Sequence, residues 1–266
     1  MIDIRALPER YRLILCDIWG VVHDGVNLYP GSAERLCAWR EEGRTIILIT
    51  NAPRTAEAVA AQLDRIGLPR DCWDGIETSG EAGIGALMAL EEPVGFIGTE
   101  SDRRILEGRG LELTAEGFRH LACVGLEPSR PAAADYARQL AELRSRDVVL
   151  HCLNPDRVVM RGGVAEPCAG ALADIYIALG GEVIWYGKPH ATIYRHALQL
   201  GGNPPPSSVL AVGDSLQTDI LGAARMGIDA VFVTGGIHGG EPFPTDFGPR
   251  NGLGDWHPVA VVDSLR

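Results

Sequence analysis

Acidic, hydroxyl and ammonium side chains follow several short apolar runs of this 266-residue chain. The first run, residues 13–17, ends on Asp17. Short apolar runs bounded by turn residues are typical of buried strands, and ligands of open α/β sheets bind beyond the carboxyl ends of such strands. The sequence therefore predicts that Asp17 is presented at a crevice, which makes it the first candidate for chemistry.

Three later segments place polar residues at or just behind other expected strands. They are the pair Thr50-Asn51, Lys188 between a glycine and a proline, and Asp214 with Asp219. Because parallel strands end at the same edge of a sheet, we expect these side chains to line one edge together with the first carboxylate.

Carboxylates, a hydroxyl and an ammonium group at one edge suit phosphoryl transfer. Asp17 and Asp214 can share Mg²⁺, which prefers oxygen ligands. Thr50 can donate to a phosphoryl oxygen, and Lys188 can neutralise the charge on the phosphoryl oxygens. A carboxylate beside a metal can also attack phosphorus and form an aspartyl phosphate.

The elements that must position these residues alternate between strand-like and helix-like runs, which predicts βαβ units and a parallel sheet. One sheet can hold both ends of the chain, so the predicted fold class is α/β with a doubly wound, Rossmann-like parallel sheet. The expected strands lie at 13–17, 45–50, 182–186, 209–213 and 230–234, and the first expected helices at 32–42 and 55–66.

A middle block has its own strands and helices, and we interpret it as a second α/β domain inserted into the first. Its expected strands lie at 94–98, 121–126 and 148–153, and its expected helices at 132–144 and 170–179. The predicted domains are a core at 1–79 and 184–266 and an inserted domain at 80–183. Glycine and proline crowd residues 235–258, so we expect a long loop there.

Composition excludes several classes of protein. A formal charge of -11 and a pI near 5.1 argue against a nucleic-acid surface, which needs clustered Lys and Arg. No run approaches the ~20 apolar residues that cross a bilayer, and an apolar signal core is missing, so we expect a cytoplasmic protein without a membrane partner. The six cysteines lack a C-x-x-C pair, which favours buried free thiols over a zinc site or a disulfide framework.

In their order along the chain these motifs resemble those of the haloacid dehalogenase (HAD) superfamily, and most closely its NagD-like branch, subclass IIA. The resemblance spans nearly the whole chain, and an insert of the right size stands between the second and third motifs. The matching stretches are Asp17-Ile18-Trp19-Gly20-Val21 followed by Pro30-Gly31, Thr50-Asn51, Gly187-Lys188-Pro189, Gly213-Asp214 through Thr218-Asp219, and Asn154-Pro155-Asp156, which resembles a cap segment.

The resemblance implies a Mg²⁺-dependent phosphatase whose nucleophile is Asp17. It implies that Mg²⁺ is bound by Asp17, the backbone carbonyl of Trp19 and Asp214. Asp219 would orient waters or Asp214 from behind these ligands.

The resemblance also implies how the substrate is held. Thr50 and Lys188 would bind the phosphoryl group, with Asn51 as a further candidate. The inserted domain would act as a cap that closes on the site and contacts the rest of a small phosphorylated metabolite, such as a sugar phosphate or a related ester or anhydride. Asn154 is the candidate contact in that cap, and Arg157 and Arg161 could meet a second anionic group or be solvated surface.

Trp19 stands where this family normally has a second Asp, the general acid for the leaving group. An indole N–H is a donor only, and acid-base help is worth ~10²- to 10⁴-fold. Three interpretations stay open. The protein is a phosphatase narrowed to good leaving groups, such as acyl phosphates or phosphoanhydrides; or it has a relocated acid, for which His23 and Asp24 are the nearest candidates; or it binds phosphorylated ligands without turnover.

A rival from another enzyme class is a serine esterase, because Gly213-Asp214-Ser215-Leu216 spells the nucleophile signature of the GDSL esterases. In those proteins the serine lies near the N-terminus and an Asp-x-x-His near the C-terminus. Here the motif comes late, and Asp255-Trp256-His257 has the wrong spacing, so this alternative is remote. The sequence leaves open a homo-oligomeric state and the role of residues 235–258.

Overall fold

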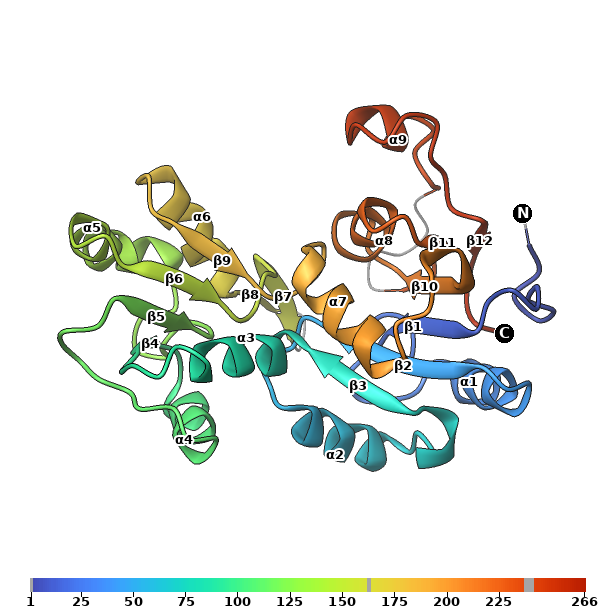
Figure 1. Cartoon of the computed structure of the whole chain (residues 1–266), viewed down its shortest axis with the longest axis horizontal. Coiled ribbons are helices and arrows are strands. Elements are labelled where there is room, and N and C mark those ends of the chain that lie inside the picture. Colours follow the sequence, from blue (N-terminus) through green and yellow to red (C-terminus); the bar gives the residue numbers. More distant parts are fainter. Residues whose placement is uncertain (1, 162–163, 237–241) are drawn as a thin grey trace. The chain divides into compact units, whose positions relative to one another are not determined.

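The computed structural model describes residues 2–161, 164–236 and 242–266, whose elements are traced in Figure 1. The chain forms two compact units. The first contains Met1–Thr50, Ala56–Glu77 and Lys188–Arg266, and the second contains Asn51–Thr55 and Thr78–Gly187. Each is built on a parallel sheet, which confirms the predicted α/β fold class.

The first unit holds a six-stranded sheet in the order β12-β11-β10-β1-β2-β3. Strand order runs outward in one direction from β1 to β3 and in the other from β10 to β12, so it reverses between β1 and β10. Crevices at such reversals are where doubly wound sheets bind ligands. The strands are β1 (Leu13–Asp17), β2 (Thr45–Thr50), β3 (Gly75–Thr78), β10 (Val209–Gly213), β11 (Asp229–Val233) and β12 (Ala260–Val262).

Helices and short turns of helix connect these strands. Side chains two residues apart along a strand share one face, so Leu13 and Leu15 of β1 point the same way. They belong to one buried cluster with Ile193 and Ala197 of α7. The helical elements are α1 (Ser32–Glu41), α2 (Ala56–Ile66), η1 (Arg70–Cys72), α7 (Ala191–Leu200), η3 (Pro206–Ser208), the π-helical turn η4 (Leu216–Ile220), α8 (Leu221–Arg225) and α9 (Phe247–Arg250).

The second unit holds a four-stranded parallel sheet and an antiparallel hairpin. The sheet order is β4-β5-β6-β9, with β4 (Gly95–Ile97), β5 (His120–Cys123), β6 (Val149–Cys152) and β9 (Val183–Trp185). The other elements are the hairpin strands β7 (Val158–Arg161) and β8 (Val164–Pro167), and the helices α3 (Ser79–Met88), α4 (Glu100–Gly108), η2 (Ala133–Tyr136), α5 (Ala137–Ser145) and α6 (Ala169–Ala178).

The strand near residue 184 corrects the predicted boundary at 183/184. We expected residues 182–186 to join the sheet of the first unit, but β9 pairs with β6, with Val183 opposite Leu150. The second unit therefore extends to Gly187. An apolar strand shows by its sequence that it is buried, but its neighbour is chosen by packing in three dimensions.

The glycine- and proline-rich stretch at 235–258, of which residues 235–236 and 242–258 are described, is also not a plain loop. It contains α9, and Phe247 is buried in the core cluster of the first unit. Phe243 and Trp256 flank Phe247, with ring centroids 5.2 and 5.8 Å from its own. Aromatic side chains thus anchor a segment whose backbone composition predicts a loop.

Replacement of Phe247 by alanine is expected to lower the free energy of unfolding by about 3 kcal/mol, because it leaves a cavity among these rings. Denaturant-induced unfolding followed by circular dichroism measures the change. Leu200→Ala is the control, since Leu200 is 54% exposed and should change stability by less than about 1 kcal/mol. Equal losses for the two variants would contradict an anchoring role of Phe247.

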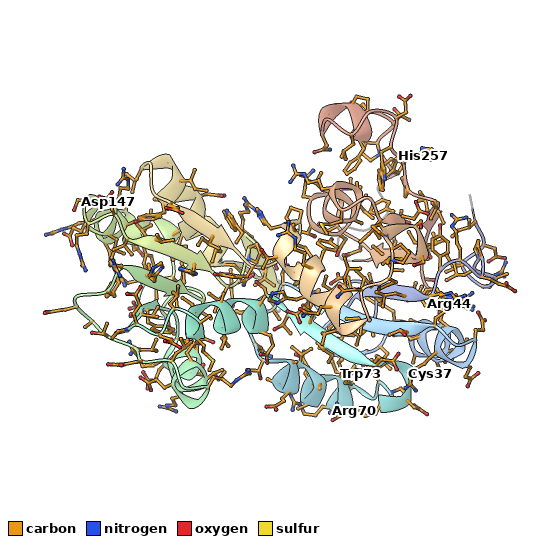
Figure 2. The ribbon with its side chains drawn as sticks, viewed as in Figure 1. Cys37, Arg44, Arg70, Trp73, Asp147 and His257 are labelled. Atoms are coloured by element: carbon orange, nitrogen blue, oxygen red, sulfur yellow. A yellow bond between two sulfur atoms is a disulfide. The ribbon has the colours of Figure 1, made fainter. Side chains whose placement is uncertain are left out.

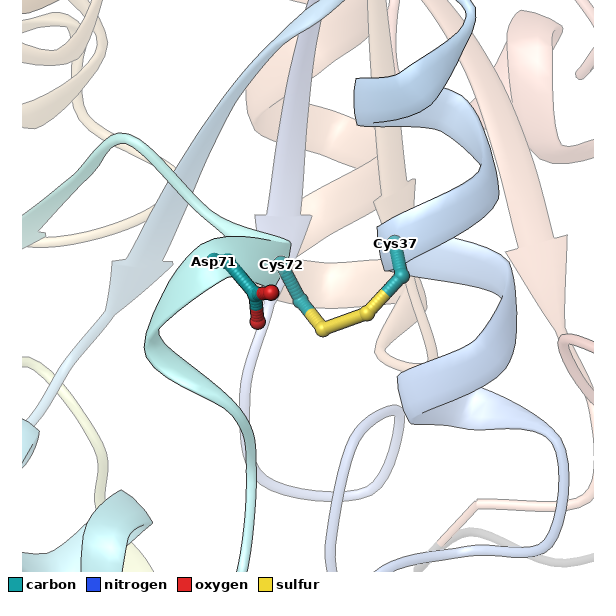
Figure 3. A group of neighbouring side chains, drawn as sticks. All are labelled: Cys37, Asp71 and Cys72. Carbon is teal, nitrogen blue, oxygen red and sulfur yellow. A yellow bond between two sulfur atoms is a disulfide. The ribbon is translucent and has the colours of Figure 1, made fainter.

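Cys37 of α1 and Cys72 of η1 form a disulfide, shown in Figure 3, which corrects the expectation that all six thiols are free. Their α-carbons are 4.1 Å apart although the residues are 35 positions apart in the chain. The carboxylate of Asp71 lies beside the sulfurs, but sulfurs joined to each other are not available as metal thiolates. The remaining cysteines, Cys16, Cys123, Cys152 and Cys168, are free and buried as predicted.

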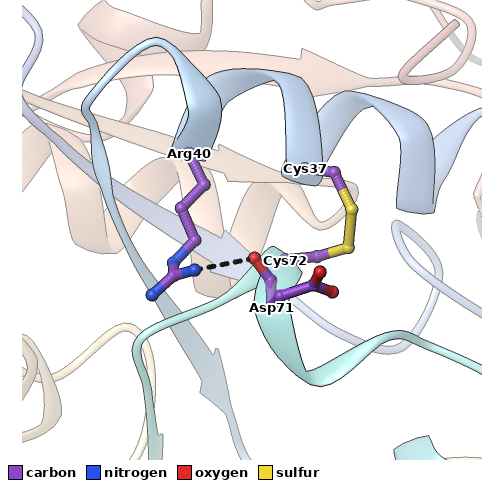
Figure 4. The surroundings of a disulfide bond; sticks show 4 residues. All are labelled: Cys37, Arg40, Asp71 and Cys72. Carbon is purple, nitrogen blue, oxygen red and sulfur yellow. Dashed lines mark hydrogen bonds between the residues drawn. A yellow bond between two sulfur atoms is a disulfide. The ribbon is translucent and has the colours of Figure 1, made fainter.

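Cationic side chains tie down the surroundings of this disulfide. The Arg40 guanidinium donates to the carbonyl oxygen of Asp71 at 2.9 Å, as Figure 4 shows. Arg70 lies over the Trp73 ring, 5.1 Å from its centroid, and both are labelled in Figure 2. The Arg40 bond and the disulfide hold η1 against α1, while the Arg70–Trp73 contact lies within the η1 segment.

Two histidines on neighbouring strands form a hydrogen-bonded row in the second unit. His151 Nε2 lies 2.8 Å from His120 Nδ1, and His151 Nδ1 lies 2.6 Å from the Tyr186 hydroxyl. His120 Nε2 lies 3.1 Å from a Glu92 carboxylate oxygen. One arrangement of protons satisfies every contact: Tyr186 donates to His151, which donates to His120, which donates to Glu92. Burial, and secondarily His120, lowers the pKa of His151 to about 4.

This depressed pKa predicts acid sensitivity. The unfolded chain binds a proton at His151 below about pH 6.5, whereas the folded chain stays neutral there down to about pH 4. Stability from this residue is thus complete above pH 6.5 and declines as pH falls toward 4, by roughly 2 kcal/mol at pH 5. Unfolding at pH 7.5 and 5.0 should show a smaller loss for His151→Gln than for wild type. The exposed control His257→Gln should follow wild type; identical losses in all three would contradict the assignment.

No helix within residues 2–161, 164–236 and 242–266 is long and apolar enough to span a membrane.

Candidate active site

The register of the first sheet brings the predicted residues to one edge. Asp17 lies opposite Ile49, so Thr50 comes one residue beyond it on β2. Cys16 lies opposite Val212 on the other side, so Gly213 is level with Asp17 and Asp214 follows it. The two aspartates therefore flank the point where strand order reverses, and Thr50 lies on the adjacent strand, as predicted.

Lys188 joins this edge by its side chain although no strand of the first sheet leads to it. Its Nζ donates to Asp17 Oδ1 at 2.5 Å and to Asp219 Oδ1 at 2.6 Å. All three side chains are at least nine-tenths buried. A buried ammonium group between two carboxylates satisfies both electrostatically and orients their oxygens.

Asp219 is held in place from several sides, and its role behind the metal ligands stays a prediction. It lies in η4, and its Oδ2 accepts from the backbone N–H of Ser215 at 3.2 Å. A Cβ at Gly213 would lie 2.2 Å from Asp219 Cβ, so the strand end must be glycine for η4 to approach so closely. Gly213, the glycine before Asp214, thus leaves the space that the Asp219 side chain fills.

Asp214 is 4% exposed, and the backbone of two glycines lies close to its carboxylate. A Cβ at Gly20 would lie 2.1 Å from Asp214 Oδ2, and one at Gly236 would lie 2.4 Å from the same oxygen. Gly20 also has φ 92°, a conformation that favours glycine. These glycines had no predicted role; the signal in the sequence was a glycine in each loop that follows a strand of the sheet.

The charges in this site fit a divalent cation. One ligand oxygen from each of Asp17, Asp214 and Asp219 lies within 4.8 Å of the others. Burial, and then the Asp219 carboxylate, raise the pKa of Asp17 well above its ordinary value. Burial lowers the pKa of Lys188, but Asp17 and Asp219 outweigh it and raise that pKa well above its ordinary value. Three buried carboxylates, two of which are bonded to the Lys188 ammonium group, are the oxygen-rich donor set that Mg²⁺ prefers.

The loop after β1 seats Trp19 in a defined place. Its ring lies against Gly25, where a Cβ would be 2.5 Å from Trp19 Cη2. The Trp19 and His23 rings meet edge-on, with centroids 5.5 Å apart and an interplanar angle of 72°. The indole is partly exposed, whereas Asp17 and Gly20 are buried. The Trp19 side chain is thus packed against other residues of its own loop.

Both candidates for a relocated acid have other contacts in the same loop. His23 Nδ1 accepts from the Gly25 N–H at 2.9 Å, and burial lowers the pKa of His23. Asp24 Oδ1 accepts from the N–H groups of Asn27 and Val26 at 2.7 and 2.8 Å, and these bonds lower the pKa of Asp24. Asp24 is also exposed. These contacts suit a turn better than proton transfer.

Asn51 and Asn154 belong to the second unit, where each side chain has a hydrogen bond. Asn51 Nδ2 donates to Asp156 Oδ1 at 2.8 Å, and Asn154 Oδ1 accepts from the Asp156 N–H at 3.2 Å. Their contacts with substrate stay predictions. Arg157 forms an exposed ion pair with Asp174, and the Arg161 side chain lies outside the described residues.

The structure lends no support to the serine esterase alternative. Ser215 lies just before η4, and its backbone N–H is bonded to Asp219. His257 is exposed, and its Nδ1 lies 3.1 Å from the carbonyl oxygen of Asp255. The described contacts of His257 are therefore local and do not involve the serine.

The fold and site together define a doubly wound α/β protein with a cluster of buried carboxylates and a lysine at its switch point. Residues 14–112 match the family model described as haloacid dehalogenase-like hydrolase, and residues 185–266 match a second described as HAD-hydrolase-like. A solved hydrolase of the haloacid dehalogenase-like family from Brucella suis 1330 is 35% identical, with a TM-score of 0.83 over 97% of each chain. The chain belongs to the haloacid dehalogenase-like hydrolase family.

Two curated relatives are named phosphatases. The ribonucleotide monophosphatase NagD of Escherichia coli K12 is 29% identical over 235 residues, which cover 84% of this chain and 88% of that protein. The human glycerol-3-phosphate phosphatase is 26% identical over 272 residues, which cover 88% and 84% of the two chains. The superfamily resemblance is thus confirmed, with a NagD protein among the relatives.

Proposed function

We propose that this protein is a Mg²⁺-dependent phosphohydrolase that acts on a small phosphorylated metabolite through an aspartyl phosphate on Asp17. The observation that carries the proposal is the buried cluster of Asp17, Asp214 and Asp219, whose ligand oxygens lie within 4.8 Å of one another, with Lys188 bonded to the first and third. The phosphatase names of the relatives support it.

In the proposed reaction, a carboxylate oxygen of Asp17 attacks the phosphorus atom, and the bond from phosphorus to the leaving oxygen breaks with its electron pair on that oxygen. Water then attacks the phosphorus atom of the aspartyl phosphate, the bond from phosphorus to the Asp17 oxygen breaks with its electron pair on the carboxylate, and the protons of the water leave with the inorganic phosphate or pass to solvent. Lys188 and Thr50 hold the phosphoryl oxygens, which carry the charge that is stabilised in the transition state.

Asp17, the backbone carbonyl of Trp19 and Asp214 would hold Mg²⁺, while Asp219 keeps Lys188 and the η4 turn in place behind them. When bound, the cation would offset the negative charge that the carboxylates and the phosphoryl group bring together. Close approach of Gly20 and Gly236 keeps the Asp214 carboxylate in one position for this role.

The proposed substrates are phosphorylated compounds with good leaving groups. Sugar phosphates belong to this class only where the leaving oxygen needs little protonation. Trp19 cannot donate and retrieve a proton near neutral pH. His23 Nδ1 and Asp24 Oδ1 each accept a hydrogen bond from a backbone N–H group. The leaving groups of acyl phosphates and phosphoanhydrides depart without a proton, so these two kinds of compound are the favoured substrate class.

The same observations favour a second candidate function, a protein that binds phosphorylated ligands without turnover. A site that holds phosphate and cation but lacks a proton donor can bind its ligand and fail to release the leaving group. Tight Mg²⁺-dependent binding with no phosphate release from any substrate class would select this candidate.

The second unit is proposed to act as a cap that recognises the part of the substrate that does not react, with Asn154 among its contacts. Closure of such a cap would exclude water from the reaction. A cytoplasmic location and the absence of nucleic-acid or membrane partners stay predictions from the sequence, and a homo-oligomeric state stays open.

A screen of phosphate esters, acyl phosphates and nucleotides with and without Mg²⁺ tests the proposal. Inorganic phosphate release that requires Mg²⁺ and is strongest for acyl phosphates or anhydrides is expected. Release that survives a chelator, or that is absent from every class, would reject the proposed hydrolysis.

A further inference from the structure

A compact group of contacts joins the two chain segments next to Thr50 and Lys188. We call it the Asn51 knot and define it as Asn51, Pro155, Asp156 and Gly187, all within the second unit. Asn51 is 6% exposed, and its Nδ2 donates to Asp156 Oδ1 at 2.8 Å. A buried hydrogen bond to a carboxylate is stronger than one between neutral groups, so it resists rearrangement.

The other end of the Asn51 amide is enclosed by Gly187. A Cβ at Gly187 would lie 2.5 Å from Asn51 Oδ1 and 2.5 Å from Pro155 Cγ. The absence of a side chain therefore lets the backbone at 187 approach both residues. Because Nδ2 is held by Asp156 and Oδ1 lies against Gly187, the orientation of the amide is set.

The turn that presents Asp156 is fixed as well. The Asp156 N–H donates to Asn154 Oδ1 at 3.2 Å. A Cβ at Gly170 would lie 2.3 Å from the Pro155 carbonyl oxygen, so α6 approaches this turn closely. The Asp156 carboxylate is thus presented to Asn51 by a packed turn.

The Asn51 knot lies next to residues of the candidate active site in the chain. Asn51 directly follows Thr50, and Gly187 directly precedes Lys188. These are the two residues that the proposed function assigns to the phosphoryl group, and the knot joins their neighbours. A misplacement of about 1 Å at reacting groups can cost on the order of 10²-fold in rate.

We propose that Asn51 and Asp156 are positioning residues that hold Thr50 and Lys188 at the spacing phosphoryl transfer requires, and that Asn51 acts through this knot instead of by touching phosphate. The inference rests on the proposed function and replaces the earlier assignment of Asn51 as a phosphate ligand. It assigns a role to Asp156 that its sequence neighbourhood did not indicate.

Two substitutions of Asp156 separate the hydrogen bond from the charge. Asp156→Ala removes the acceptor, so kcat for acetyl phosphate should fall by about 10-fold or more while KM changes less than about 3-fold. Asp156→Asn keeps a carbonyl oxygen for Asn51 Nδ2 and should retain at least about half of wild-type kcat. Asp174→Ala, which removes an exposed carboxylate of the same unit, should match wild type.

An exchange of the two groups distinguishes positioning from phosphate contact. Asn51→Asp sets two carboxylates against each other and should lower kcat by about 10-fold or more. Combined with Asp156→Asn, it restores one amide against one carboxylate, and kcat should recover at least about fivefold. A direct phosphate ligand would not recover, because the carboxylate at position 51 would still repel the phosphoryl group. Failure to recover, or full activity of Asp156→Ala, overturns the proposal.

Binding of inorganic phosphate keeps this test separate from that of the proposed function. Isothermal titration calorimetry with Mg²⁺ measures the affinity for inorganic phosphate, whether or not wild type turns over. Asp156→Ala and Asn51→Asp should bind phosphate more weakly than wild type, and the double variant should regain the affinity. Thermal unfolding checks that each variant is folded. Equal Kd values across folded variants, or no phosphate binding by wild type, would overturn the knot's positioning role; absence of turnover alone would reject only hydrolysis.

Discussion

Asp17→Asn is expected to reduce Mg²⁺-dependent phosphate release by roughly 10³-fold or more, because an amide cannot act as the nucleophile that forms an acyl phosphate. The substitution keeps the size of the side chain, and an oxygen can still accept the hydrogen bond that Lys188 Nζ donates to Asp17 Oδ1. The fold should therefore survive while the chemistry is lost. Phosphate release from acetyl phosphate at saturating Mg²⁺ measures the effect.

A second aspartate provides the matched control. Asp64 is exposed and paired with Arg70 on the surface, so Asp64→Asn makes the same chemical change away from the site and should leave the rate within about twofold. Rapid quenching should trap phosphate on wild type and not on Asp17→Asn. If Asp17→Asn keeps more than a tenth of wild-type activity, the nucleophile lies elsewhere and the proposed mechanism is wrong.

Trp19→Asp is expected to raise kcat/KM for alkyl phosphate esters by about 10²-fold, at the low end of what general acid-base catalysis supplies. This corresponds to about 2.7 kcal/mol of transition-state stabilisation. Substrates with good leaving groups should gain far less, since their leaving oxygen does not need a proton. Wild type should accordingly prefer acetyl phosphate over glycerol phosphate, and the variant should narrow that preference.

The packing of Trp19 explains why we expect a gain at the low end of the range for general acid-base catalysis. The indole fills the space between Gly25 and His23, so its removal leaves a gap next to the new carboxylate. A carboxylate in an unadapted loop is held less firmly than one whose surroundings orient it, and orientation accounts for much of the catalytic gain.

Trp19→Asn isolates the proton from the loss of the indole, because its side chain has the size of Asp and no acidic proton. It should not accelerate hydrolysis of alkyl esters. If both variants gain equally, Trp19 acts by blocking the substrate and not by the absence of an acid. Equal wild-type rates on alkyl and activated phosphates would show that a residue other than Trp19 supplies the acid.

Several residues of the site were predictable from the sequence because strand ends impose their own geometry. Apolar runs identify β1, β2 and β10, and parallel strands in register present their following residues at one edge. Asp17, Thr50 and Asp214 needed no further information. Lys188 was predicted at the same edge for a wrong reason, because the strand before it belongs to the other sheet and only its long side chain reaches Asp17.

The residues that sequence reasoning missed act through distances between segments far apart in the chain. Gly236 touches Asp214, Gly187 touches Asn51, and Cys37 bonds to Cys72. A glycine or a cysteine has the same local pattern whether or not a partner lies near it, so tertiary structure alone reveals these contacts.

The sequence by itself determined the α/β class and the edge where the carboxylates gather, because hydrophobic periodicity and residue type are local properties of a chain. The tertiary structure decided which sheet β9 joins, that residues 242–258 include an anchored helix, and that Asn51 binds Asp156. Each of these depends on which surfaces meet when the chain is compact, and such pairings are set by packing and hydrogen-bond satisfaction across the whole fold.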